Sequence, residues 1–263
     1  MLNNHGKTSI AVIVFYIPAT ILSAYLACYR HKRPRLSWNI LLFFSTIRLA
    51  SAILVILYER TPSTGLMVAS IILLNTGVFP LVAATMGFLR IILSHEQKVH
   101  VRIGQSLLFS RILFFVGLGL QIAGGCLEGS DSVSNVETGL RLVKAGYSCV
   151  VVFVACLLAV QGYLWVHREE VSRMSLSILQ ALAAALPFII VRITYLFLSV
   201  VDASDLRWND LVGPVAPFLV MGLLMECIVV CVYLATGFVI PDWKSLRGRR
   251  VVSSSGVPLV EEC

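Results

Sequence analysis

Two residues able to do chemistry stand inside long runs of apolar residues, Arg192 and Glu226. A guanidinium or carboxylate group in hydrocarbon costs several kcal/mol, so each side chain must face protein or water and find a partner. Glu226 is the only carboxylate deep within such a run. Intramembrane ionisable groups mark functional sites, and we expect these two residues to lie at one.

Further polar residues stand at a similar depth in other apolar runs. At a rise of about 1.5 Å per residue, each lies roughly 12–15 Å from the same end of its run. The set comprises Arg48, Asn75, Arg192 and Glu226, with Tyr16 slightly shallower. Polar groups that several helices contribute at one depth predict a buried polar pocket near the middle of a membrane.

Two interpretations of this pocket stay open. Arg192 and Glu226 can form an ion pair that only joins two helices, with Arg48 and Asn75 completing the hydrogen bonds. Alternatively, the pocket is a ligand or catalytic site. Two arginines against one glutamate leave a surplus positive charge, which would suit a phenolate, a carboxylate or a polarised carbonyl.

The elements that position these residues are membrane-spanning helices. The chain is 58% hydrophobic and 13% charged, whereas soluble domains carry about 25% charged residues. Runs of this length, continuously apolar rather than alternating, predict an all-α, polytopic membrane protein with seven transmembrane helices. The runs cover about 8–29, 38–58, 66–93, 106–127, 140–166, 176–201 and 218–240, and the third is interrupted by Asn75, Gly77 and Pro80.

The loops between these runs predict the orientation. With seven spans, twelve basic residues fall on one side of the membrane and four on the other. Since basic loops face the cytosol, the C-terminus is expected to be cytosolic and the N-terminus lumenal. We therefore expect a transmembrane domain over 1–240 and a cytosolic polar tail over 241–263, which its composition predicts to be disordered.

Several classes of function lack their motifs. No metal-binding pattern of histidines, cysteines or aspartates is present, and neither a nucleotide-binding glycine loop nor a serine-hydrolase motif occurs. No metal and no cofactor are expected. The net charge of +7 is attributed to membrane orientation, and no nucleic-acid partner is expected.

Four segments of the apolar runs resemble a known family. They are FYIP (15–18), TIRL (46–49), PFIIVRITY (187–195) and MECIVV (225–230). The chain resembles, over about 8–237, a family of fungal seven-helix integral membrane proteins. That family is similar to the membrane-bound terpene cyclases of meroterpenoid pathways, of the ascofuranone and macrophorin type.

This resemblance implies a metal-independent isomerase. Such a cyclase protonates an epoxide or terminal alkene on a farnesyl-type chain that is attached to an aromatic or quinone head. A dry cavity protects the carbocation from water, and aromatic faces stabilise it. We expect Glu226 to be the acid, with Arg192 beside it at the catalytic centre. The expected substrate-binding residues are Arg48, Asn75, Tyr16, Tyr195 and Phe188.

The acid depends on what Arg192 contacts. A neighbouring arginine stabilises the ionised carboxylate, so a direct Arg192–Glu226 pair would make Glu226 a poor proton donor. In that case the expected acids are Glu59, Asp202 or Asp210, near the mouth of the pocket.

The resemblance also implies partners and a location. A lipophilic prenylated substrate and membrane lipid are expected to bind, association with other pathway enzymes is expected, and the membrane is that of the endoplasmic reticulum. The alternative is a seven-helix receptor or sensor without catalytic activity, which the lumenal N-terminus fits. The sequence LRI at 89–91, where such receptors carry a DRY-like motif, weakens it. A small-solute transporter, weakened by the lack of internal repeats, is a third possibility.

Overall fold

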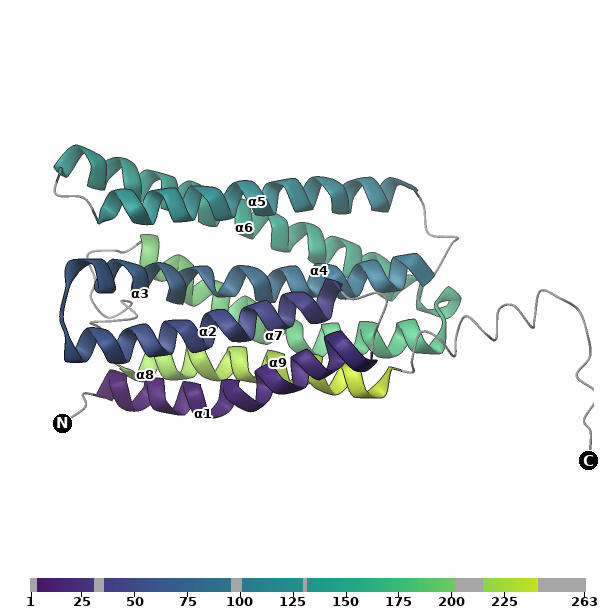
Figure 1. Ribbon diagram of the computed structural model, residues 1–263. Coiled ribbons are helices and arrows are strands. Elements are labelled where there is room, and N and C mark those ends of the chain that lie inside the picture. Colours follow the sequence, from purple (N-terminus) through teal and green to yellow (C-terminus); the bar gives the residue numbers. More distant parts are fainter. Residues whose placement is uncertain (1–3, 31–35, 96–100, 130–131, 202–214, 241–263) are drawn as a thin grey trace, which may run out of the picture.

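The computed structural model describes residues 4–30, 36–95, 101–129, 132–201 and 215–240 (Figure 1). The described part is helical throughout its long segments and contains no strand, which confirms the all-α prediction. Asp202, Asp210 and the predicted tail 241–263 lie outside the described residues.

Seven stretches are long and apolar enough to span a membrane, as predicted. Five are formed by single long helices: α1 (Asn4–Tyr25), α2 (Leu36–Arg60), α5 (Val101–Glu128), α6 (Val133–Val166) and α7 (Arg173–Val201). A π-helical turn, η1 (Leu26–Arg30), continues α1, and a short 3-10 turn, η2 (Arg168–Glu170), precedes α7. The third stretch is α3 (Thr64–Thr76) plus α4 (Val78–His95), and the seventh is α8 (Val215–Pro217), η4 (Phe218–Leu224) and α9 (Met225–Val239).

The third span breaks where its sequence predicts an interruption. Helix α3 ends at Thr76, and the backbone N–H of Gly77 donates to the carbonyl of Leu73 at 3.1 Å. Pro80 falls in the first turn of α4, where a helix tolerates a residue without an N–H. Because of this break, the carbonyl of Leu74 is available to accept a hydrogen bond from a side chain.

The long helices run side by side along one axis (Figure 1). Helix α1 packs on α2 and contacts α9, α2 packs on α3 and α4, and α7 packs on α9. Helices α5 and α6 pack mainly on each other and form an outer pair along one side of the bundle (Figure 1). The first described residue of α1 and the last of α9 lie at opposite ends of the bundle (Figure 1).

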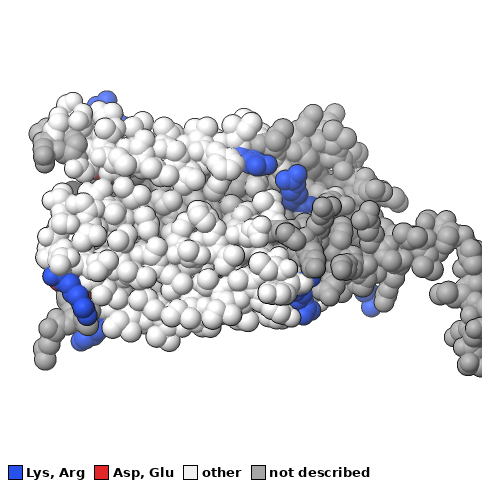
Figure 2. Space-filling view, in the orientation of Figure 1, with Lys and Arg blue, Asp and Glu red and all other residues white. Residues whose placement is uncertain are grey.

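The surface of the bundle matches a bilayer. In Figure 2 a broad band without Lys, Arg, Asp or Glu covers the middle of the visible face, and the basic side chains lie toward its two ends. Large apolar side chains are exposed on this surface, among them Val14 at 67% and Phe109 at 62%. Apolar patches of this extent mark a membrane-facing surface. The protein is therefore a multi-pass membrane protein.

Candidate functional site

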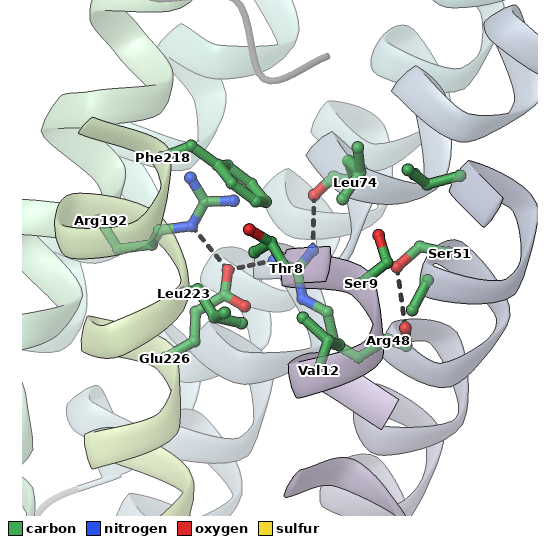
Figure 3. Close-up of a pocket in the computed structure, with 12 residues that line it drawn as sticks. Thr8, Ser9, Val12, Arg48, Ser51, Leu74, Arg192, Phe218, Leu223 and Glu226 are labelled. Atoms are coloured by element: carbon green, nitrogen blue, oxygen red, sulfur yellow. Dashed lines mark hydrogen bonds and ion pairs between the residues drawn. The ribbon is translucent and has the colours of Figure 1, made fainter. Parts of the chain in front are cut away.

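The structure brings Arg48 of α2, Arg192 of α7 and Glu226 of α9 into direct contact. The Arg192 Nε–H donates to Glu226 Oε1 at 2.6 Å, and Arg48 Nη2 donates to the same oxygen. All three residues are at most 3% exposed. Figure 3 shows the two guanidinium groups approaching the carboxylate from two sides. These residues are called the charged cluster below.

A second contact of Arg48 depends on the break between α3 and α4. Its Nη1 donates to the carbonyl of Leu74 at 3.1 Å, so the side chain satisfies a backbone group that the helix end leaves open. The guanidinium also packs against Gly77. A Cβ built on Gly77 would lie 3.0 Å from Arg48 Cζ and 3.1 Å from its Nε.

Glu226 follows a π-helical turn, and Arg192 lies against an aromatic ring. Glu226 stands in the first turn of α9, directly after the π-helical η4. A π-helical turn changes the direction of the side chains that follow it and is frequent at functional sites. On α7, the guanidinium of Arg192 lies 5.5 Å from the centre of the Tyr195 ring, a cation–π distance.

A small cavity adjoins the charged cluster. Its volume is about 20 Å³, which is room for roughly one water molecule. One part of its wall is polar and comes from the cluster and from hydroxyl residues of α1 and α2, and the other part is apolar. The lining residues are Thr8, Ser9, Val12, Arg48, Ser51, Ala52, Val55, Leu74, Arg192, Phe218, Leu223 and Glu226 (Figure 3).

The electrostatics of the cluster are unbalanced. Two guanidinium groups and one carboxylate give a net charge of +1 in a buried site. Within the described part of the chain, Arg48 Nε and Glu226 Oε2 are buried and have no hydrogen-bond partner. A buried polar atom without a partner destabilises the fold by about 1–3 kcal/mol, and more when the group is charged. Arg48 Nε–H is thus a donor, and Glu226 Oε2 an acceptor, that no group in the described residues satisfies.

The remaining predicted binding residues do not line the cavity. Tyr195 is fully buried beneath Arg192. Tyr16 is also fully buried, and its ring centre is 5.8 Å from that of Phe44. Asn75 and Phe188 are half-buried and do not belong to the cavity lining. Of the residues predicted to lie at one depth, only the three charged ones are in direct contact.

Of the alternative acids, Glu59 is described. It is half-buried near the end of α2 and accepts a hydrogen bond from the backbone N–H of Gly6 at 2.8 Å. Val55, one turn earlier on α2, lines the cavity, as does Thr8 on α1. Glu59 thus lies about one helical turn beyond the cavity. Asp202 and Asp210 fall outside the described residues.

Sequence reasoning missed the hydroxyl residues of the cavity wall. Ser51 follows Arg48 by three residues on one helix, so helical spacing alone would have placed the two on one face. Thr8 and Ser9 stand near the start of the first apolar run, where nothing in the sequence distinguishes them from ordinary helix-start residues. The carbonyl of Leu74 was signalled by the glycine and proline that interrupt the third run.

The contact between Gly77 and Arg48 gives a testable prediction. We expect Gly77→Ala to lower the thermal unfolding temperature of the purified protein, because the added methyl group pushes on a guanidinium held at both ends. Overpacking of this kind costs about 1–3 kcal/mol. Gly65→Ala in the first turn of α3 is the control, since a Cβ there meets nothing within 4 Å. Alanine favours the helix over glycine, so the control should be neutral or stabilising. Equal shifts in both variants would show that Gly77 does not constrain Arg48.

Comparison with known proteins identifies the family. A family model described as a domain of unknown function (DUF7702) matches residues 2–242. The chain belongs to this family. No curated protein and no solved structure matches it. The DUF7702 match includes all seven membrane-spanning stretches and every residue of the charged cluster.

Proposed function

We propose that this DUF7702 protein is a membrane-bound terpene cyclase of meroterpenoid biosynthesis, acting on a farnesyl-type chain attached to an aromatic or quinone head. The observation that carries the proposal is the charged cluster, in which three buried ionised side chains meet beside a cavity inside an otherwise apolar bundle. Resemblance to the membrane-bound cyclases supports the choice of reaction.

The chemistry fits the surroundings of the site. A proton added to an epoxide oxygen breaks one C–O bond, the chain alkenes close rings onto the resulting cation, and loss of a proton from carbon makes the product an isomer. The bundle keeps water from the cation. In this proposal Arg48 and Arg192 hold the polar head. Aromatic rings lie beside both, with the centre of the Phe44 ring 5.7 Å from the Arg48 guanidinium and that of Tyr195 5.5 Å from the Arg192 guanidinium.

Within this proposal Glu226 is not the proton donor. Two guanidinium donors on one of its oxygens stabilise the ionised carboxylate, so Glu226 instead orients the arginines. Among the described alternatives the acid is Glu59, one turn beyond the cavity. Asp202 and Asp210 remain candidates for the same role. Substrate binding also requires the helices to separate, because a farnesyl chain is far larger than the cavity of about 20 Å³.

That small volume is the observation that favours a second candidate. A seven-helix receptor or sensor that binds only a small polar group would need no larger space. The two candidates differ in whether the ligand leaves chemically changed.

The experiment supplies membranes containing the full chain with a farnesylated phenol whose terminal alkene is epoxidised, and detects products by mass spectrometry. We expect a cyclised isomer, and we expect Glu59→Gln to reduce its formation by at least about 100-fold, the usual scale of acid catalysis. Glu137→Gln is the control, because that carboxylate is exposed on the surface of α6, where it pairs with Arg141. A wild-type protein that is inert on a panel of prenylated phenols and quinones, yet couples to a G protein, would support the receptor.

Orientation and location complete the proposal. The lumenal N-terminus and cytosolic tail are supported by the predominance of basic residues on one side. Residence in the endoplasmic reticulum, and association with other pathway enzymes, follow from a substrate that is dissolved in that membrane. Protease protection of epitope tags at the two ends of the chain in microsomes checks the orientation, and a protected C-terminal tag would reverse it.

A further inference from the structure

Two arginines outside the charged cluster are exposed on the apolar surface of the bundle, Arg90 of α4 and Arg111 of α5. Arg90 is three residues before the end of the membrane-spanning stretch Thr64–Leu93, and Arg111 is two residues after the start of Phe109–Glu128. At a rise of about 1.5 Å per residue, both lie within about 5 Å of the limit of the apolar region. Phospholipid headgroups begin at that level.

The two positions belong to the same end of neighbouring helices. Helix α4 ends at His95 and α5 begins at Val101 at one end of the bundle, and the two helices contact each other (Figure 1). Toward one end of the visible face in Figure 2, two groups of basic atoms lie close together, and no acidic atoms lie beside them. Positive charge is therefore concentrated at the edge of the apolar band.

Neither guanidinium group forms an ion pair with a carboxylate among the described residues. Arg111 instead lies over the ring of Phe115, with its Cζ 5.8 Å from the ring centre. An arginine near the end of a span extends its side chain so that the charge stays at the headgroup level. The counter-charge for this pair must therefore come from the surroundings of the protein.

We propose that Arg90 and Arg111 together bind the phosphate of an anionic phospholipid. The planar fork of a guanidinium matches two phosphate oxygens, and basic groups between transmembrane helices bind lipid headgroups of this kind. The occupant is a lipid rather than free phosphate, because α5 continues from Arg111 into an exposed apolar surface. Its side chains there are Ile112, Phe115 and Val116, exposed by 57%, 55% and 49%, and one acyl chain lies against them.

The charge of the two arginines selects the class of lipid. Phosphatidylcholine carries the same phosphate, but its quaternary ammonium group would lie beside two guanidinium groups of the same sign. Phosphatidylglycerol carries the phosphate without a cation. The binding surface formed by Arg90 and Arg111 therefore favours a phospholipid of net negative charge. This inference is independent of the proposed function, since neither arginine belongs to the charged cluster.

Native mass spectrometry of the full-length protein measures this preference. The protein in detergent micelles is titrated with dioleoyl phosphatidylglycerol or dioleoyl phosphatidylcholine, which differ only in the head group. We expect the wild type to bind its first phosphatidylglycerol at least about tenfold more tightly than its first phosphatidylcholine, because two arginines act on the difference in charge. Equal binding of the two lipids overturns the proposal.

A pair of double variants assigns the preference to these two residues. Arg90→Gln with Arg111→Gln should bring the two lipids to within about twofold of each other. The control, Arg168→Gln with Arg173→Gln, removes the same charge at the same end of the bundle, where Arg168 lies outside the spans and next to Glu169 (Figure 1). The control should keep the wild-type preference. Equal losses in both double variants would reveal diffuse attraction to a basic end, and the proposal would then be wrong.

A photoactivatable lipid tests the same surface in the wild-type protein, so the result does not depend on whether a variant folds. Phosphatidylglycerol with a diazirine on one acyl chain, close to the glycerol, should label the segment 109–116 of α5. An excess of unlabelled phosphatidylglycerol should suppress this labelling, and the same excess of phosphatidylcholine should not. Suppression by both lipids to the same extent, or no labelling of this segment, contradicts the proposal.

Discussion

Glu226→Leu is expected to lower the free energy of unfolding by about 3–5 kcal/mol, the range for removing one partner of a buried ion pair. The substitution leaves Arg48 and Arg192 as two buried positive charges without the carboxylate that they share. The measurement is equilibrium unfolding of the purified protein by SDS in mixed micelles. Unfolding at the same SDS fraction as the wild type would show that the three charges do not depend on one another.

A triple variant distinguishes a structural cluster from a functional one. Arg48→Met, Arg192→Met and Glu226→Leu together remove every charge of the cluster, and such replacements of buried ion pairs are often neutral or stabilising by about 1–4 kcal/mol. We expect the triple variant to unfold no more easily than the wild type and to lose ligand binding and product formation. A triple variant that forms the cyclised product at the wild-type rate would leave the cluster with a structural role only.

Gly139→Ala is expected to destabilise the α5–α6 pair by at least about 1–3 kcal/mol, the range for overpacking. A Cβ on Gly139 would lie 2.7 Å from the backbone oxygen of Gly124 and 2.9 Å from the backbone nitrogen of Glu128. Backbone atoms of a packed helix cannot rotate away as a side-chain end can, so the two helices must separate. Small residues at such crossings let membrane helices approach closely.

The matched control lies on the partner helix. At Gly119 of α5 an added Cβ meets nothing within 4 Å, so Gly119→Ala should be neutral or stabilising. Thermal unfolding followed by size-exclusion chromatography compares the two variants. The close approach of α5 and α6 would be contradicted if Gly139→Ala were as stable as Gly119→Ala. A double variant with Gly124→Ala, across the same contact, tests whether the two effects are coupled, as contacting sites usually are.

The number and extent of the membrane-spanning helices were readable from the chain because the bilayer imposes them. Hydrocarbon has no water to satisfy backbone groups, so each crossing is a continuous apolar helix of about 20 residues. The seven stretches, the interruption of the third by Gly77 and the burial of Arg48, Arg192 and Glu226 were all predictable on that basis. That Arg48, Arg192 and Glu226 share one level of the bundle was predictable too, since the rise per residue of a helix is constant.

The depth of a residue does not tell which way its side chain points around the helix axis. The tertiary structure decided that direction. Asn75 stands at the same predicted depth as Arg48 yet lies outside the cavity lining, because its helix turns a different side to the site. Ser51 and the carbonyl of Leu74 belong to the site because packing of α2 on α3 brings them there.

The amino-acid sequence alone was enough to predict that an arginine and a glutamate would be buried at one level of a seven-helix bundle. That both Arg48 and Arg192 contact one oxygen of Glu226 was decided only by how α2, α7 and α9 pack around it. The same packing shapes a cavity of about 20 Å³ beside these three residues. Side-chain partners depend on the rotation and spacing of helices, which many weak contacts across the whole bundle set together.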